Sequence, residues 1–291
     1  MDQSFLSKLK AKWNEEKFVC VGLDTDLSKL PESLKGDSLE TNGPKTEAVI
    51  YEFNKAIIDQ TQDLVCAYKI NSAFYEADPY SYEAMLNTFI YIQRTYPDIP
   101  VILDAKRGDI DNTNKGYVKW AFETLKADAM TIHPYLGKTA NLSFLDNKDK
   151  GIIVLVKTSN QGSGEFQNLK VKTEEGLEFE SLYEYVATRV AKNWNDNGNC
   201  AVVVGATYPE ELKTVREIIG DMPILIPGIG AQGGDLEKTV KNGLNSQKQG
   251  IIITSSRSII YASNSEDFAT AARSETEKLH NQIKEIINHV E

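Results

Sequence analysis

The chain has 291 residues, of which 41% are hydrophobic and 25% charged, a composition typical of a soluble globular protein rather than a disordered one. Its length suits either two average domains or one α/β barrel. The formal net charge of −10 argues against a nucleic-acid-binding surface, which is usually basic, so any anionic ligand has to be held by local groups.

The cysteines and the N-terminal segment bear on where the protein works. Cys20, Cys66 and Cys200 lie in apolar runs without the spacing of a metal site. We interpret them as buried, reduced thiols of a cytosolic protein, with metal ligation or nucleophilic catalysis as less favoured alternatives. Residues 1–13 lack the continuous apolar stretch of a signal peptide, and no window approaches the ~18 apolar residues of a membrane helix. These patterns predict a cytoplasmic protein that is not embedded in a membrane.

Eight short apolar runs rich in β-branched residues predict strands along the chain. They are Phe18–Asp24, Val65–Ile70, Val101–Lys106, Ala129–His133, Gly151–Thr158, Ala201–Thr207, Pro223–Ile229 and Gly250–Ser255. Their hydrophobicity is nearly continuous, as it is in strands buried on both faces of a parallel sheet.

Segments with helical periodicity lie between these strands. They include Thr46–Gln62, Tyr82–Tyr96, Asn114–Lys126 and Leu182–Trp194, and a closing amphipathic helix carries Leu279, Ile283, Ile286, Ile287 and Val290 on one stripe. Strands alternate with helices without a break in composition. We therefore predict one α/β domain over residues 1–291, a single (β/α)₈ TIM barrel rather than a two-domain doubly wound protein.

Two predicted connections are longer than a barrel needs: residues 25–45 after strand 1 and residues 160–180 after strand 5. The second is polar, with glycines at its start, and it follows a strand end on the side where barrels build active sites. Long loops in compact domains are often functional. A mobile lid and a decorative insertion are both compatible with this pattern.

Charged and polar residues stand where the predicted strands end, at the rim that carries active sites in barrels. They are Asp24, Lys69, Asn71, Asp104, Lys106, Lys157, Thr158, Ser159 and Arg257. Each has a purely structural explanation, such as a cap, a solvated strand end or an ion pair. Their joint placement at one rim favours an active site.

The third strand has a distinctive charge pattern. Asp104 and Lys106 are two residues apart, so both side chains face the barrel mouth. Inward-facing charges need partners, and Lys69 and Asp109 are the nearest candidates. An alternating array of this kind holds a lysine protonated in a desolvated site. Such a lysine can stabilise a developing carbanion and then donate a proton to it.

A second group of residues suits a phosphate. Residues Pro227–Asp235 follow strand 7, contain four glycines and precede a helical stretch. Arg257, just past strand 8, can add a two-pronged charge-assisted contact. Barrel enzymes commonly bind phosphate between these two loops. His133, after strand 4, has no evident partner and is interpreted as structural.

Together these segments resemble the orotidine 5′-phosphate decarboxylase family along nearly the whole chain. The family signature Asp-x-Lys-x-x-Asp-[Ile/Thr]-x-x-Thr is present as Asp104, Lys106, Asp109, Ile110 and Thr113. Residues 21–24, 68–71 and 227–235 and Arg257 support it, in the expected order. The long connections after strands 1 and 5 are similar to those of the longer-loop branch of the family.

The resemblance implies a carboxy-lyase that converts orotidine 5′-phosphate to uridine 5′-phosphate, the last step of de novo UMP synthesis, without a metal or other cofactor. Lys106 would protonate C6 of the pyrimidine as carbon dioxide leaves, beside Asp104. Lys69 and Asp24 would hold ribose hydroxyls and complete the charge array. Asp109 and Thr113 would reach into the neighbouring subunit's site, which implies a homodimer with shared active sites.

The remaining implied contacts bind the substrate. Ser159, rather than the adjacent Thr158, would read the pyrimidine edge, and Gln232 and Arg257 would grip the phosphate. Asn71 and Pro227 would complete the binding surface.

Two rival functions share parts of this pattern. Metal-dependent barrels of the same suprafamily, which act on sugar phosphates, also carry Asp-x-Lys on strand 3, but they add an acidic magnesium ligand on strand 2. Here strand 2 ends in Lys69, and Val65–Asn71 contains no carboxylate. A non-catalytic barrel that binds a phosphosugar is the other rival. A protein that only binds has no reason to bury the Lys69, Asp104, Lys106 and Asp109 array.

Overall fold

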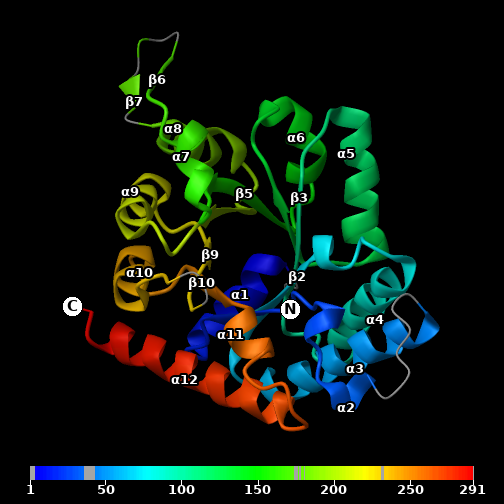
Figure 1. Ribbon diagram of the computed structural model, residues 1–291. Helices are drawn as coiled ribbons and strands as arrows, with labels where there is room; N and C mark the ends of the chain where they lie inside the picture. Colours follow the sequence, from blue (N-terminus) through cyan, green and yellow to red (C-terminus); the bar gives the residue numbers. More distant parts are fainter. Residues whose placement is uncertain are drawn as a thin grey trace.

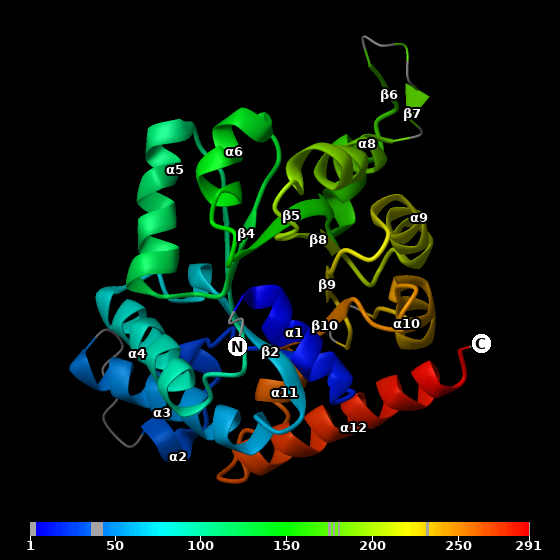
Figure 2. The same ribbon diagram turned by 180° about the vertical axis from the view of Figure 1, so that it is seen from behind.

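Eight parallel strands close into one barrel in the computed structural model, which describes residues 4–35, 43–173, 176, 178–179, 181–230 and 233–290. The order around the barrel is β1-β10-β9-β8-β5-β4-β3-β2. The strands are β1 (Val19–Gly22), β2 (Val65–Asn71), β3 (Val101–Arg107), β4 (Ala129–Ile132), β5 (Gly151–Lys157), β8 (Cys200–Val204), β9 (Ile224–Pro227) and β10 (Ile251–Ser255). Helices surround the barrel (Figures 1 and 2). The predicted (β/α)₈ fold is confirmed.

The α-helices of the described residues comprise one before β1 and one or more after each barrel strand. They are α1 (Phe5–Asn14), α2 (Glu32–Lys35), α3 (Pro44–Thr61), α4 (Pro79–Thr95), α5 (Asp111–Val118), α6 (Gly137–Leu145), α7 (Gly164–Gln167), α8 (Leu182–Arg189), α9 (Pro209–Ile219), α10 (Leu236–Gly243), α11 (Arg257–Ile260) and α12 (Phe268–Asn288). Local sequence sets their starts: Asp78 caps α4 by accepting from the backbone nitrogens of Tyr80 and Ser81, and Pro79 occupies the first helical position.

The barrel strands are buried on both faces, as their continuous hydrophobicity predicted. Every residue of β1, β4, β8 and β10 is buried. The closing amphipathic helix is α12, which packs along α3 and buries Leu279 and Ile283 (Figure 2). The core thus holds the strand ends, and the side chains they carry, in fixed positions.

One end of the barrel is covered by α1, which the sequence analysis did not predict. The Phe5 nitrogen donates to the Asp149 carbonyl at 2.9 Å, just before β5 begins. The Trp13 indole donates to the Ile251 carbonyl at 3.0 Å, at the start of β10. Because α1 lies against the amino ends of the strands, the carboxyl ends remain available for a site.

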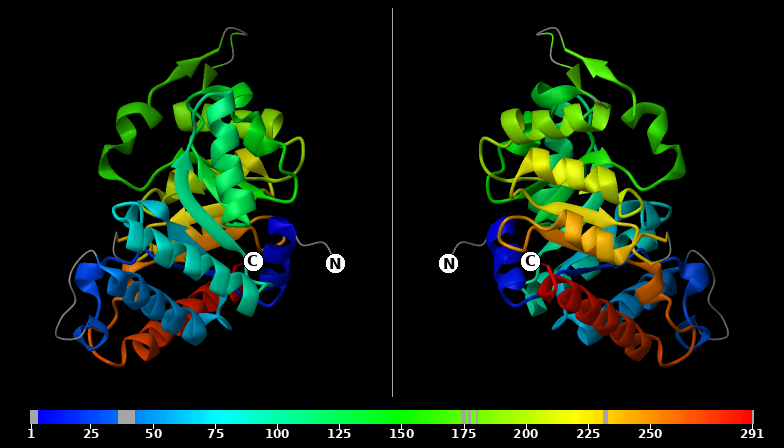
Figure 3. Two further views of the ribbon diagram at one scale, coloured as in Figure 1. Left: turned by 90° about the vertical axis from the view of Figure 1, so that its right-hand side faces the viewer. Right: turned by 90° about the vertical axis from the view of Figure 1, so that its left-hand side faces the viewer.

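The two long connections contain short elements of their own. The first holds a 3₁₀ turn, Leu27–Lys29, and α2, while residues 36–42 lie outside the described part. The second holds a 3₁₀ turn, Gln161–Ser163, then α7 and the antiparallel pair β6 (Val171–Lys172) and β7 (Glu178–Phe179). β6 and β7 extend away from the barrel (Figure 3). This connection therefore begins at the carboxyl end of β5 and projects from the barrel at β6 and β7.

Candidate active site

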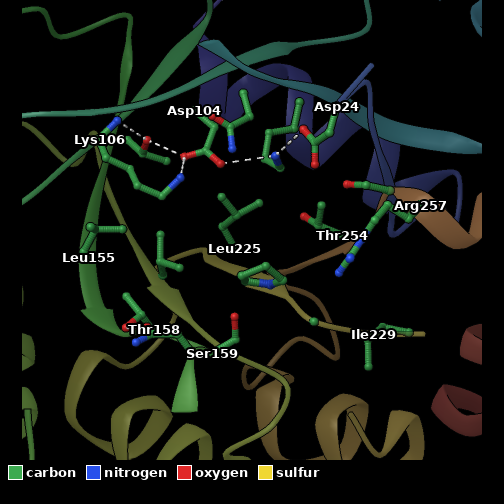
Figure 4. A pocket seen from close by; sticks show the side chains of 18 of the residues that line it. Asp24, Asp104, Lys106, Leu155, Thr158, Ser159, Leu225, Ile229, Thr254 and Arg257 are labelled. Carbon is green, nitrogen blue, oxygen red and sulfur yellow. Dashed lines mark hydrogen bonds and ion pairs between the residues drawn. The ribbon is translucent and has the colours of Figure 1, made fainter. Parts of the chain in front are cut away.

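A cavity of about 370 Å³ opens at the carboxyl ends of the barrel strands (Figure 4). Eight of the eleven residues that the sequence singled out for the site line it: Asp24, Lys69, Asn71, Asp104, Lys106, Ser159, Pro227 and Arg257. Further lining residues that the sequence analysis did not select include Thr131, Asn160, Thr254 and Ser256. The barrel thus brings together residues that are more than 230 positions apart in the chain, from Asp24 to Arg257.

Four alternating charges run along one wall of this cavity. Lys69 Nζ lies 3.3 Å from Asp24 Oδ1 and 3.2 Å from Asp104 Oδ2, and Lys106 Nζ lies 2.7 Å from Asp104 Oδ1. The Lys69 side chain is only 5% exposed, whereas that of Lys106 is 47% exposed. We call Asp24, Lys69, Asp104 and Lys106 the charge array. It has a buried centre and an accessible lysine at one end.

The array keeps its central members ionised. Burial alone would raise the pKa of the Asp104 carboxyl, but Lys69 and Lys106 outweigh burial and lower that pKa well below its usual value. Burial alone would lower the pKa of the Lys69 ammonium, but the carboxylates of Asp24 and Asp104 outweigh it and raise that pKa above its usual value. Asp104 is therefore a carboxylate and Lys69 an ammonium at neutral pH.

Thr131 of β4 supports the accessible end of the array. Its hydroxyl donates to Asp104 Oδ1 at 2.8 Å and accepts from the Lys106 backbone nitrogen at 3.0 Å. Lys106 has φ 48°, a left-handed conformation that is strained for a residue with a long side chain. Backbone strain persists where surrounding contacts hold it, and it gathers at functional sites. Thr131 thus fixes both the carboxylate and the turn that presents Lys106.

Two tyrosines hold the backbone around Asp24. The Tyr75 hydroxyl donates to the Leu23 carbonyl at 2.7 Å, and the Tyr261 hydroxyl donates to the Asp24 carbonyl at 3.2 Å. The same Tyr261 oxygen accepts from the Asp26 nitrogen at 2.6 Å. Asp24 lies two residues beyond Gly22, the end of β1, so these contacts rather than strand pairing hold the backbone that carries its carboxylate.

Ser159 faces the cavity from the opposite side (Figure 4). The hydroxyl of the neighbouring Thr158 is engaged within the loop, because it donates to Asn160 Oδ1 at 2.7 Å and accepts from Gln167 Nε2 at 2.9 Å. Between the hydroxyls of Thr158 and Ser159, the geometry thus favours that of Ser159 for contact with a ligand.

The third side of the cavity is suited to an anion. Arg257 begins α11, and its guanidinium extends toward the cavity, close to the loop after β9 (Figure 4). That loop contributes Pro227, Gly228 and Ile229. At Gly230, φ is 83°, and a Cβ atom there would lie 2.7 Å from Ser258 Oγ, so only glycine fits. Gln232 lies outside the described residues.

Asp109 and Thr113 do not line the cavity of their own chain. The Asp109 nitrogen donates to Asn114 Oδ1 at 2.9 Å, and Asp109 Oδ1 accepts from the Ile110 nitrogen at 2.6 Å. Thr113 is exposed on α5. Within one chain, therefore, the second carboxylate of the charge array is Asp24, not Asp109. His133 Nε2 lies 2.8 Å from the Gly108 carbonyl, which gives this histidine the partner that the sequence could not name.

Two of the lining residues that the sequence analysis did not select are recognisable as polar residues within apolar strands. Thr131 interrupts the apolar run Ala129–Ile132, and Thr254 follows three isoleucines in β10. A hydroxyl in a strand buried on both faces needs a partner, and that partner can be a site residue or a ligand.

The described residues contain neither a metal-binding cluster nor a membrane-spanning helix. No group of three or more histidine, cysteine, aspartate or glutamate side chains that could hold a metal ion occurs among them. None of the helices they form is both long and apolar enough to cross a membrane.

Known proteins match this chain in sequence and in fold. A sequence model of the orotidine 5′-phosphate decarboxylase / HUMPS family matches residues 17–272. An orotidine 5′-phosphate decarboxylase of Cellvibrio japonicus is 46% identical over 281 residues, which cover 96% of this chain and 98% of the relative. The solved OMP decarboxylase of Leishmania donovani superposes with a TM-score of 0.78 at 34% identity, covering 97% of this chain and 98% of that one.

The UMP synthase of Leishmania donovani superposes with a TM-score of 0.83 at 34% identity and covers 98% of this chain. The match spans only 56% of the UMP synthase chain.

Proposed function

Because the chain belongs to the orotidine 5′-phosphate decarboxylase / HUMPS family, we propose that its charge array decarboxylates orotidine 5′-phosphate. In this proposal Lys106 is the proton donor. The protein is an orotidine 5′-phosphate decarboxylase, a carboxy-lyase of pyrimidine and UMP biosynthesis. The observation that carries the assignment of roles is the ionised Asp104 held between Lys69 and Lys106 in the cavity.

The proposed step is the loss of carbon dioxide from C6 of the pyrimidine. The bond from C6 to the carboxylate breaks, and its electron pair stays on C6. Lys106 Nζ stabilises this developing charge and transfers a proton to C6, which yields uridine 5′-phosphate. Asp104 lies beside the substrate carboxylate, and the repulsion between the two disappears as that group becomes neutral carbon dioxide.

The other residues of the cavity bind the substrate in this proposal. Lys69 and Asp24 hold ribose hydroxyls, Asn71 extends this surface, and Ser159 contacts the pyrimidine edge. Gln232, Arg257 and the backbone at Pro227 hold the phosphate. Support comes from Figure 4, where Ser159 lies across the cavity from Asp104 and Lys106, and Arg257 lies apart from Ser159 on the side of Asp24.

A decarboxylation assay tests the function directly. Purified protein given orotidine 5′-phosphate is expected to form uridine 5′-phosphate without any added cofactor, and incubation with excess EDTA is expected to leave the rate unchanged. The control is a sugar-phosphate substrate of the metal-dependent barrels, which should not react. A rate that falls on chelation and returns with magnesium would contradict the cofactor-free chemistry.

We also propose that the protein is a homodimer with shared active sites. Asp109 lies just before α5 and Thr113 in its first turn, and neither lines the cavity of its own chain. Two apolar side chains of this region are exposed: Ile110, next to Asp109, is 64% exposed, and Tyr135, whose nitrogen donates to the His133 ring beside Gly108, is 91% exposed. Exposed apolar clusters usually mark an interaction surface. A second copy that covers this surface would receive Asp109 and Thr113 at the edge of its own cavity.

Subunit complementation tests the shared site. Asp109→Ala and Lys106→Ala proteins, each inactive alone, are expected to regain up to about a quarter of wild-type activity when mixed in equal amounts and re-equilibrated. Half of the dimers are then mixed, and one of their two sites has both residues intact. Mixed dimers that form, as shown by native mass spectrometry, and yet stay inactive would place Asp109 in the site of its own subunit.

The remaining proposals concern organisation and location. We propose that residues 1–291 form one domain, since strands from Val19 to Ser255 all belong to one closed barrel. We further propose that the protein works in the cytoplasm, since Cys20, Cys66 and Cys200 are free and buried thiols.

A further inference from the structure

Lys157, the last residue of β5, is a buried cation that the proposed mechanism does not use. Its side chain is 0% exposed, and it does not line the catalytic cavity. No carboxylate of the described residues forms an ion pair with it. Burying an ammonium without a counter-ion is costly, so the contacts that compensate for it have to be specific.

Three contacts surround the ammonium. Lys157 Nζ donates to Asn168 Oδ1 at 2.7 Å and lies 4.4 Å from the ring centroid of Tyr208 and 5.8 Å from that of Tyr183. A cation over an aromatic face is stabilised by the ring quadrupole, most strongly when water is excluded. Asn168 follows α7, whereas Tyr208 follows β8, so Lys157 joins two separate segments.

Both segments form hydrogen bonds with the loop that begins at Thr158. The Tyr208 hydroxyl donates to the Asn160 carbonyl at 3.2 Å and accepts from the Ser163 hydroxyl at 3.1 Å. Gln167, next to Asn168, accepts from the Thr158 nitrogen at 3.0 Å. The two ends of residues 158–168 are thus tied to each other and to Tyr208 around the Lys157 ammonium.

Ser159 sits inside this arrangement. The Thr207 hydroxyl donates to its carbonyl at 3.2 Å. A Cβ atom on Gly205 would lie 2.6 Å from the Ser159 Cα, so the end of β8 packs directly against the Ser159 backbone. Contacts with residues 205–207 therefore hold the Ser159 backbone at the edge of the cavity that Ser159 lines.

We propose that Lys157 is a positioning residue: its buried ammonium latches residues 158–168 onto Tyr208 and thereby holds Ser159 against the pyrimidine of the ligand. The inference rests on the proposed contact between Ser159 and the pyrimidine edge. Lys157 acts through the loop and not on the substrate. Its loss should therefore weaken recognition of the base without affecting the part of the ligand that carries the phosphate.

Two ligands separate these effects. Uridine 5′-phosphate fills the whole site, whereas ribose 5-phosphate lacks the pyrimidine. In isothermal titration calorimetry, Lys157→Met is expected to weaken binding of uridine 5′-phosphate about tenfold, the effect of losing about one well-placed hydrogen bond. Binding of ribose 5-phosphate should stay within about twofold of wild type. For the reaction, KM should rise more than kcat falls.

Lys150→Met is the matched control. Lys150 precedes the opposite end of β5, where its ammonium lies 5.8 Å from the Phe122 ring centroid and donates to the Ala127 carbonyl at 2.9 Å. This variant removes a half-buried lysine that also contacts an aromatic ring and an oxygen acceptor, without touching the latch, and both ligands should bind as they do to wild type.

Asn168 variants decide the matter if Lys157→Met does not fold. Asn168 is exposed, so Asn168→Ala should fold, and it should weaken the binding of uridine 5′-phosphate but not that of ribose 5-phosphate. Asn168→Asp keeps an acceptor for the ammonium and should bind uridine 5′-phosphate as wild type does. Equal weakening of both ligands, or unchanged affinity in folded Lys157→Met and Asn168→Ala proteins, overturns the latch. Wild-type protein that binds the two ligands equally well contradicts the pyrimidine contact itself and the latch with it.

Discussion

Replacing Lys106 with alanine is expected to lower kcat by roughly 10⁴-fold or more, the combined effect of losing a proton donor and the positive charge beside the developing carbanion. Lys106 Nζ lies 2.7 Å from Asp104 and is the accessible lysine of the charge array, whereas Lys69 is enclosed between two carboxylates. No other member of the array can take over the proton transfer from the same position.

The fold should survive this substitution. Without Lys106, the Asp104 carboxylate keeps its contacts with the Lys69 ammonium and the Thr131 hydroxyl, so no buried charge is left alone. Removing a residue with φ 48° and replacing it with alanine retains some strain but no clash.

The measurement is single-turnover formation of uridine 5′-phosphate, with thermal denaturation as the check on folding. Lys278→Ala is the control, because Lys278 is an exposed lysine of α12 paired with Glu275 and does not line the cavity. A folded Lys106→Ala protein that turns over at a near-normal rate would refute the assignment of Lys106 as proton donor.

The barrel could be predicted from the sequence because its strands are buried on both faces. Runs such as residues 152–154 and 251–253 have no polar position that a solvent-facing strand would need, which indicates a parallel sheet covered by helices. Eight such runs alternating with helices, without a break in composition, favour a closed barrel over two doubly wound domains. The two-residue strands β6 and β7 could not be predicted, since two residues define no periodicity. Helix α1 was missed although Phe5, Leu9 and Trp13 have helical spacing and are buried.

The charge array was predictable only in part. Spacing along β3 placed Asp104 and Lys106 together, but it also suggested Asp109 as a partner within the chain. The chain turns at Lys106, and Asp109 then contacts Asn114 and Ile110 instead. The actual partner, Asp24, comes from the other side of β2, and Thr131 from β4. Which strands are neighbours is a property of barrel closure, and no local pattern encodes it.

Replacing Arg257 with alanine is expected to reduce kcat/KM for orotidine 5′-phosphate roughly 10³-fold, which corresponds to a loss of several kcal/mol of transition-state stabilisation. This is the effect expected if the guanidinium makes two charge-assisted hydrogen bonds to the phosphate. The phosphate is far from the bond that breaks. Binding energy from such a non-reacting group is used to orient the ring and to exclude water at the reacting centre. Both kcat and KM should therefore change.

A substrate without the phosphate distinguishes this role from a structural one. Orotidine, the corresponding nucleoside, cannot use Arg257, so wild type and Arg257→Ala should process it at similar rates. Arg273→Ala is the control, because Arg273 is paired with Asp63 on the surface and lies outside the cavity; it should leave both substrates unaffected.

The two substrates separate a phosphate-binding role of Arg257 from a structural one. Arg257 is the first residue of α11, a four-residue helix whose Ser258 packs against Gly230 of the neighbouring loop. If the guanidinium mainly supported that packing, its loss would displace the cavity wall and slow both substrates alike. Equal losses on orotidine and orotidine 5′-phosphate would therefore make Arg257 structural and remove it from the phosphate site. A loss confined to the phosphorylated substrate leaves the guanidinium as the group that recognises the dianion, since Ser258 and Gly230 remain in place for both.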